Sequence, residues 1–245
     1  MNIIAKLVMF GWLPAVAALF VLMPPRRAVL IAYVGAWLFL PVVVFEISGL
    51  PGYTQASATS AGVLLGVLLF DTRRLMSFRP SLIDLPIVLW CVAPMFSSIE
   101  NDLGVYDGFA EVFTQVVVWG VPYFIGRLYY GDLSGARSIA IAIVLGGLIY
   151  VPLCLWEIRM SPQLHRVLYG THQHSFLQQM RFGGFRPMVF MDHGLMVGMW
   201  MCGATLVGAW LWASGVVRRL FGVPFWIWLG APAVTAVWCK AIYAV

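Results

Sequence analysis

The sequence predicts an all-α protein, a polytopic bundle of transmembrane helices with about eight spans. Hydrophobic residues make up 62% of its 245 residues and charged residues only 10%. Soluble domains carry about 25% charged residues, so water would not hold this chain. The apolar runs are long enough for helices that cross a bilayer, which need roughly 20 residues each. Pairs of arginines stand in the short turns between several of these runs.

The apolar runs place the expected spans at residues 7–23, 28–47, 55–70, 85–99, 112–130, 138–156, 188–213 and 224–243. The third span is the weakest, because its apolar core is short and must recruit polar residues, tilt or be partly re-entrant. The first span follows Lys6 as a signal peptide would. It ends at Pro24-Pro25-Arg26-Arg27 rather than at a small-residue cleavage site, which predicts a retained helix. We expect one transmembrane domain over residues 1–245.

The basic residues orient the spans. Nine of the fifteen lie in turns that alternate correctly with eight spans, and such turns are cytoplasmic by the positive-inside rule. These nine are Arg26, Arg27, Arg73, Arg74, Arg79, Arg127, Arg137, Arg218 and Arg219. Both termini then face outward, as do the turns at residues 48–54 and 100–111. Glu46, Glu157 and the acidic 100–111 turn lie on the outer side, where they could pair with the arginines or hold the hydroxyls of a sugar. A plain solvated face is the favoured interpretation.

Residues 157–187 form an outward loop that departs from this rule, because it carries four of the six remaining basic residues. Ser161 and Pro162 suit the start of a helix. Leu164, Val167 and Leu168 then fall on one face at helical spacing, and Gly170 ends the pattern. This predicts a short helix lying in the membrane interface with its apolar side down. Pro187 is expected to open the next span.

Arginines are the strongest site candidates in this loop. Arg181 and Arg186 bracket the flexible Gly183-Gly184 turn, so they can converge on one anionic ligand. A guanidinium grips a phosphate with two parallel hydrogen bonds. Arg159 and Arg166 are weaker candidates for the same role. Contact with lipid head groups, or plain solvated charge, is the alternative interpretation.

The histidines of the same loop give a weaker signal. His193 follows Asp192 at the outer mouth of a helix, but neighbours in a helix point about 100° apart, so we expect no bond between them. His172 and His174 lack the further ligands that a zinc site needs, and no metal site is predicted. The four cysteines are isolated in apolar runs and are expected to pack: Cys91, Cys154, Cys202 and Cys239. The net charge of +5 reflects cytoplasmic arginines and predicts no nucleic-acid partner.

The stretch from Met180 to Met201, MRFGGFRPMVFMDHGLMVGMWM, resembles the O-antigen ligase/polymerase family of bacterial envelope proteins. An outward loop in that family closes with an arginine, a glycine-rich turn and a proline-bearing start of a long helix. The many-span layout and the stretch from Val234 to Lys240 also look like the N-terminal half of the family.

The resemblance implies a metal-independent glycosyltransferase with no cofactor, in the bacterial inner membrane. It would transfer or polymerise glycan from a polyprenyl-pyrophosphate carrier, at the outer face, to a lipid or glycan acceptor. The pyrophosphate would be held by Arg181 and Arg186, with Arg159 and Arg166. A general base would take the proton of the acceptor hydroxyl.

Members of the family continue with further spans and with a loop that supplies another arginine and a catalytic histidine. We therefore expect this chain to be the N-terminal portion of that architecture and to lack the catalytic loop, with His193 as a weak local candidate for the base. The alternative is a non-catalytic membrane binder or transporter of an anionic lipid or solute. Transporters collect charges at the membrane midplane, whereas here they collect at one surface, which favours the first interpretation.

Overall fold

The computed structural model describes residues 2–47, 50–181 and 183–239. The chain divides into two compact units. The first unit holds residues 1–8, 34–42 and 136–245, and the second holds residues 9–33 and 43–135. Helices α1 (Ile3–Leu22) and α2 (Pro25–Phe39) each contribute residues to both units. The units are described separately below.

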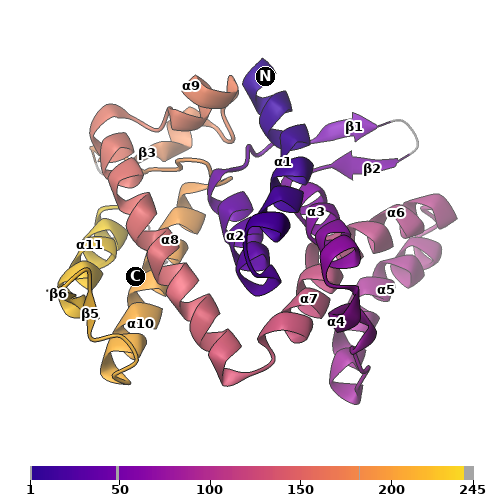
Figure 1. Ribbon diagram of the computed structural model, residues 1–245. Helices are drawn as coiled ribbons and strands as arrows, with labels where there is room; N and C mark the ends of the chain where they lie inside the picture. The colour runs from indigo at the N-terminus through magenta and orange to yellow at the C-terminus, as the bar shows by residue number, and fades with distance from the viewer. Residues whose placement is uncertain (1, 48–49, 182, 240–245) are drawn as a thin grey trace. The chain divides into compact units, whose positions relative to one another are not determined.

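The first unit is built around three long helices and the connection between the first two (Figure 1). The helices are α8 (Leu133–Met160), α10 (Gly194–Ala213) and α11 (Phe225–Trp238). The connection from α8 to α10 contains α9 (Leu164–Tyr169), the 3-10 helix η3 (Phe176–Gln179) and the antiparallel strands β3 (Met180–Arg181) and β4 (Gly184–Phe185). A second small hairpin, β5 (Arg219–Leu220) with β6 (Val223–Pro224), links α10 to α11.

Small residues let the long helices of the first unit approach closely. A Cβ added to Gly147 of α8 would lie 2.5 Å from the Cβ of Ala204 in α10. A Cβ added to Gly208 of α10 would collide with the side chain of Leu229 in α11. Lipid provides no hydrophobic drive between helices, so this close backbone packing is what holds membrane helices together.

The second unit contains the remaining helices and one hairpin. Strands β1 (Phe45–Ile47) and β2 (Leu50–Tyr53) are antiparallel, with Phe45 opposite Tyr53. The helical elements that follow are α3 (Gln55–Phe70), α4 (Thr72–Met76), η1 (Leu82–Asp84), α5 (Leu85–Glu100), α6 (Val105–Gln115), the π-helical turn η2 (Val116–Gly120) and α7 (Val121–Tyr130). Its core is a cluster of buried apolar side chains from α1, α2, α3 and α7.

Side-chain hydrogen bonds account for two features of the second unit. Thr54 and Ser57 form a reciprocal capping box, so α3 starts at Gln55 and covers the predicted span at 55–70. Within α3, Ser60 donates a 2.8 Å hydrogen bond to the carbonyl of Val117. A π-turn disturbs the regular backbone ladder, and this side chain satisfies a carbonyl inside it.

The structure confirms that the chain is dominated by helices that suit a membrane. Among the described residues, five helical stretches are long and apolar enough to cross one: Ile3–Leu22, Leu82–Glu100, Val105–Tyr130, Leu133–Met160 and Gly194–Ala213. Helices α3 and α11 are apolar but shorter. The count of eight spans stays a prediction.

Two predicted span boundaries are wrong. The span expected at 28–47 is helical only to Phe39, because Pro41 disfavours helical backbone at the residue before it, and residues 41–44 are irregular. The span expected at 188–213 becomes helical only at Gly194. Pro187 therefore does not open the helix. Backbone groups of residues 188–190 are instead bound by side chains from α8.

The short loop helix exists, but its start and its buried face differ from the prediction. Helix α9 begins at Leu164 after Gln163, rather than at Ser161-Pro162, and ends at Gly170 in the left-handed conformation. Its buried side chains are His165 and Tyr169, four residues apart. Val167 and Leu168 are 71% and 41% exposed. Placement of this exposed apolar side in a membrane interface stays a prediction.

Candidate functional site

Glu157 ties both ends of the α8–α10 connection to helix α8. Its side chain is 1% exposed. One carboxylate oxygen accepts from the backbone N–H of Leu164 at 2.9 Å, and the other accepts from Met188 at 2.8 Å and from Val189 at 2.7 Å. The solvated role expected for Glu157 is therefore wrong. Three backbone donors satisfy its two buried oxygens, as a buried polar group requires.

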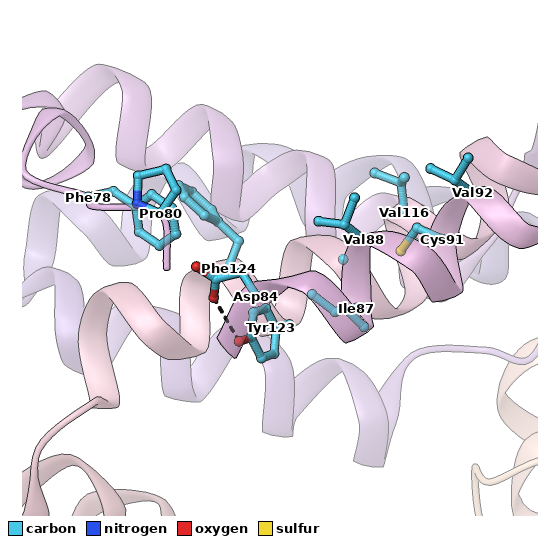
Figure 2. Close-up of a pocket in the computed structure, with 11 residues that line it drawn as sticks. Phe78, Pro80, Asp84, Ile87, Val88, Cys91, Val92, Val116, Tyr123 and Phe124 are labelled. Atoms are coloured by element: carbon cyan, nitrogen blue, oxygen red, sulfur yellow. Dashed lines mark hydrogen bonds between the residues drawn. The ribbon is translucent and has the colours of Figure 1, made fainter. Parts of the chain in front are cut away.

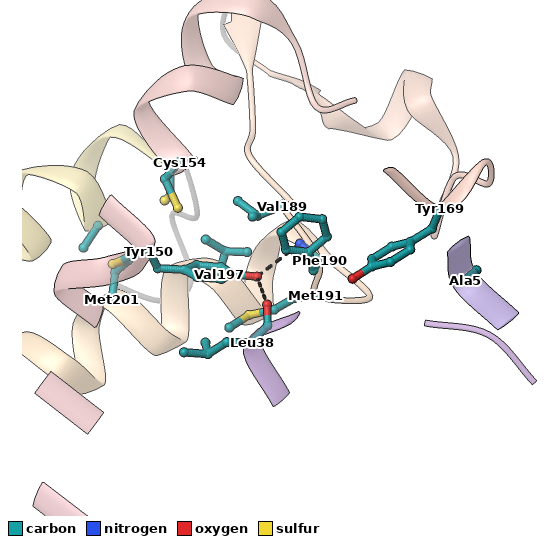
Figure 3. Packing of buried hydrophobic residues seen from close by; sticks show 12 residues of the cluster. Ala5, Leu38, Tyr150, Cys154, Tyr169, Val189, Phe190, Met191, Val197 and Met201 are labelled. Carbon is teal, nitrogen blue, oxygen red and sulfur yellow. Dashed lines mark hydrogen bonds between the residues drawn. The ribbon is translucent and has the colours of Figure 1, made fainter. Parts of the chain in front are cut away.

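Tyr150, two helical turns earlier in α8, makes a second anchor for the same connection. Its hydroxyl accepts from the backbone N–H of Phe190 at 3.1 Å and donates to the carbonyl of Leu38 at 2.9 Å. Figure 3 shows this hydroxyl at the centre of the apolar cluster of the first unit. Residues 188–190 are thus held by two buried side chains in a turn, which the Met191 N–H closes on the Met188 carbonyl at 3.0 Å, and Val189 adopts a positive φ of 53°. Such a conformation is costly for a β-branched residue and persists only where the surroundings enforce it.

This bracing places Arg186 against the first turn of α10. The backbone N–H of Arg186 donates to the carbonyl of Gln179 at 2.8 Å, which extends the β3–β4 pairing by one residue pair. Residues paired in this way project their side chains to the same face. A Cβ added to Gly194 would collide with the side chain of Arg186 and lie 3.0 Å from Oε1 of Gln179. Both side chains therefore cover Gly194, and only glycine fits there.

Gln179 is the most unusual polar group of this cluster, because it is completely buried. Neither its Nε2 nor its Oε1 has a hydrogen-bond partner in the part of the chain that the structure describes. A buried amide without partners costs roughly 1–3 kcal/mol, and native proteins keep few of them. Sequence reasoning missed this residue, since a glutamine between Gln178 and Met180 looks like ordinary loop.

The four predicted arginines lie in different surroundings. Arg186 is 7% exposed. Arg159, in the last turn of α8, and Arg166, in α9, are exposed on the surface. Arg181 lies in β3 opposite Gly184, and its side chain falls outside what the structure describes. Arg186 is thus the described arginine of the loop that joins the buried cluster, together with Gln179.

His193 acts as the N-cap of α10, a role that sequence reasoning did not assign to it. Its Nδ1 accepts from the backbone N–H of Leu195 at 3.1 Å. A neutral imidazole with an accepting Nδ1 carries its proton on Nε2. The lone pair that a general base needs is therefore engaged in the cap in this conformation. His174 packs edge-on against His193, with ring centroids 4.9 Å apart.

His165 is a structural residue of the core. It is 1% exposed, its Nε2 accepts from the backbone N–H of Val42 at 3.2 Å, and its Nδ1 lies 2.6 Å from the carbonyl of Thr171. Both contacts suit the neutral ring. Burial lowers the pKa of His165, and the nearby His172 adds to this, while the bond to Thr171 acts in the opposite direction. Among the described residues, no group of three or more His, Cys, Asp or Glu side chains is placed to hold a metal ion.

The second unit contains a separate pocket of about 390 Å³ between α5 and the η2–α7 segment. Figure 2 shows Phe78 and Pro80 at one end, Val92 and Val116 at the other, and Asp84 and Tyr123 between them. Asp84 accepts from the hydroxyl of Tyr123 at 2.8 Å, forms an ion pair with Arg127 and accepts from the backbone N–H of Ser81 at 2.7 Å. The pocket is otherwise lined by apolar side chains, on helices with the length and composition of membrane spans. Sequence reasoning missed it, although Ser81 and Asp84 stand at capping-box spacing.

Comparisons with models of known protein families, with curated proteins and with solved structures find no match for this chain. The functional argument therefore rests on the residues of the chain itself and on the likeness of residues 180–201 described above.

Proposed function

We propose that the α8–α10 connection binds the pyrophosphate of a polyprenyl-linked glycan. The protein then acts in transfer or polymerisation of that glycan at the outer face of the bacterial inner membrane. The observation that carries the proposal is the burial of Arg186 at the N-terminus of a 20-residue apolar helix. The resemblance of residues 180–201 to O-antigen ligases and polymerases supplies the chemistry of the ligand.

Electrostatics favour a phosphate at this position. A guanidinium is always charged and matches a phosphate with two parallel bonds. The contact is stronger where water is scarce, and Arg186 is almost completely buried. The N-terminal end of α10 adds a partial positive charge of the same sign. Stabilising the charge that develops on a leaving pyrophosphate is how such a site would assist glycosyl transfer.

A ligand would reach the buried Arg186 by displacing the β3–β4 hairpin. Strands β3 and β4 pair through two residues each, and the turn between them contains Gly183 with a φ of 68°. Displacing this hairpin breaks few hydrogen bonds, whereas residues 188–190 stay anchored by Glu157 and Tyr150. A lipid-linked ligand would therefore enter from the hairpin side.

Binding of polyprenyl pyrophosphate to the purified protein in lipid nanodiscs tests the proposal. Arg186→Ala should weaken binding roughly ten- to a hundredfold, because charge-assisted hydrogen bonds contribute about 1.5–3 kcal/mol. Arg186→Lys should also weaken it, because lysine lacks the planar fork. Arg73→Ala, at an exposed position of α4, is the control for a non-specific loss of charge. Unchanged affinity in a folded Arg186→Ala protein would contradict the proposal.

A second candidate function, a non-catalytic binder of an anionic membrane lipid, is favoured by the state of His193. Its Nδ1 is engaged with Leu195, so this local candidate for a general base is not free to take a proton. Incubation with a lipid-linked oligosaccharide and a glycan or lipid acceptor separates the two functions. Turnover that disappears in His193→Ala would identify His193 as the base. Carrier binding without turnover supports the binder.

A further inference from the structure

We infer that the side-chain amide of Gln179 is a ligand-binding group, which donates a hydrogen bond to a phosphate oxygen held beside Arg186. The inference rests on the proposed function, in that the phosphate is the one held by Arg186, but it assigns a second and uncharged group to the contact. The sequence pattern did not single out Gln179 as a site residue.

The side-chain amide of Gln179 is buried without a hydrogen-bond partner among the described residues. An amide offers two N–H donors and an oxygen acceptor. In Gln179 these atoms are completely buried and find no partner among the described residues. Buried polar groups are almost always hydrogen-bonded, and a catalytic role or a bound ion or water is among the explanations for the exceptions. An apolar side chain of the same length would fill this space without that cost, so packing alone does not call for glutamine.

Gln179 lies next to both Arg186 and the first turn of α10. Gln179 pairs with Arg186 across the extended β3–β4 ladder, through the bond from the Arg186 N–H to the Gln179 carbonyl. Its Oε1 lies 3.0 Å from the point where a Cβ on Gly194 would be. The amide therefore lies with the Arg186 side chain against the first turn of α10, whose end is positively polarised. Such surroundings select an oxyanion rather than a cation as the missing partner.

The residues around Gln179 are held in place by contacts within the protein. Arg186 leads directly into residues 188–190, which Glu157 and Tyr150 hold through backbone hydrogen bonds. Gly194 opens α10 under the cap of His193. Gln179 is thus fixed between elements that do not depend on ligand for their placement. A preformed amide donor of this kind binds a phosphate oxygen without first being ordered.

Gln179→Met tests the inference, because methionine has similar length and no hydrogen-bonding amide. Gln178→Met is the matched control, since Gln178 is the exposed neighbour in the same 3-10 helix. The measurements are the melting temperature in nanodiscs without ligand and the affinity for polyprenyl pyrophosphate. Gln179→Met should melt at the same temperature as the wild type or higher, and should bind about tenfold more weakly. Gln178→Met should match the wild type in both.

Gln179→Glu provides a second arm, because its carboxylate repels phosphate while keeping the shape of the side chain. It should reduce affinity more than Gln179→Met does. A lower melting temperature of Gln179→Met with unchanged affinity would overturn the inference, because it would show that an internal water satisfies the amide. If Arg186→Ala weakens binding and Gln179→Met does not, the role of Gln179 fails while the proposed function stands.

Inorganic pyrophosphate and nanodiscs rich in phosphatidylglycerol identify the source of the phosphate. Binding of either that depends on Gln179, with no preference for the polyprenyl carrier, would support the amide as a phosphate ligand and contradict the glycan function. Absence of binding by all three phosphate probes would overturn both.

Discussion

The carboxylate of Glu157 receives the backbone N–H of Val189 at 2.7 Å, across 32 residues of chain. A residue of the long helix α8 thereby fixes the backbone of the segment that precedes α10. The adjacent Met188 N–H binds the same oxygen, and Leu164 binds the other. The conformation of the α8–α10 connection, and with it the position of Arg186, depends on this one side chain.

Glu157→Gln should therefore destabilise the protein and weaken ligand binding together. The amide nitrogen of glutamine cannot accept a hydrogen bond. The backbone N–H groups on the side where this nitrogen replaces a carboxylate oxygen would therefore be left without an acceptor. The expected loss is about 1–3 kcal/mol in the free energy of unfolding, measured by thermal or denaturant unfolding in nanodiscs or detergent. Glu100→Gln, at the exposed end of α5, is the control and should have little effect. Equal stability of the two variants would show that Glu157 does not anchor the connection.

The close approach of α8 and α10 predicts a steric effect at Gly147. A Cβ there would lie 2.5 Å from the Cβ of Ala204, so Gly147→Ala must push the helices apart. Overpacking of this kind costs about 1–3 kcal/mol, read as a lower melting temperature. Gly203→Ala is the matched control in α10, because a Cβ at Gly203 has no neighbour within 4 Å. A Gly147→Ala protein as stable as Gly203→Ala would be incompatible with this helix packing.

Lowering the pH should reduce the stability of the folded protein through the protonation of His165. Burial lowers its pKa in the folded protein, while the unfolded chain titrates near the ordinary value of about 6.5. The unfolded state therefore binds more protons as the pH falls below about 6.5, so stability falls from there down to the lowered folded pKa. Melting temperatures between pH 8 and pH 5 measure the effect.

His165→Gln serves as the non-titrating counterpart, because an amide can still accept from Val42 and donate to Thr171. Its melting temperature should depend less on pH over the same window than that of the wild type. His172→Gln removes an exposed histidine from the same loop and should keep most of the wild-type slope. A slope that His165→Gln leaves unchanged would assign the pH dependence to other groups.

The orientation of the chain predicts opposite accessibility for two exposed serines. Ser175 lies in the α8–α10 connection and Ser77 at the end of α4. With native cysteines replaced, an impermeant thiol reagent added to whole cells should label Ser175→Cys and not Ser77→Cys. This follows from the positive-inside distribution of the arginines. The reverse pattern would place the connection, and the phosphate site with it, in the cytoplasm.

The sequence alone determined the class of this protein and the approximate place of its helices. Long apolar runs can do little else in a membrane than form helices, because backbone groups must be satisfied within the segment. The third span illustrates this: Thr54 and Ser57 make a local cap, and α3 runs over Gln55–Phe70, the range that the apolar pattern predicts. Composition and local capping are properties of neighbouring residues, so they can be read without a fold.

The tertiary structure decided which polar residues of the α8–α10 connection are anchors and which belong to the candidate site. Glu157 looked like a solvated charge and is a buried acceptor of three backbone donors, while Gln179 looked like ordinary loop and stands unpartnered beside Arg186 among the described residues. The start of α10 was misplaced for the same reason, since side chains of α8 hold residues 188–190 out of the helix. The anchoring of residues 188–190 depends on contacts between residues 31 to 40 positions apart, and such contacts leave no periodic or local trace in the chain.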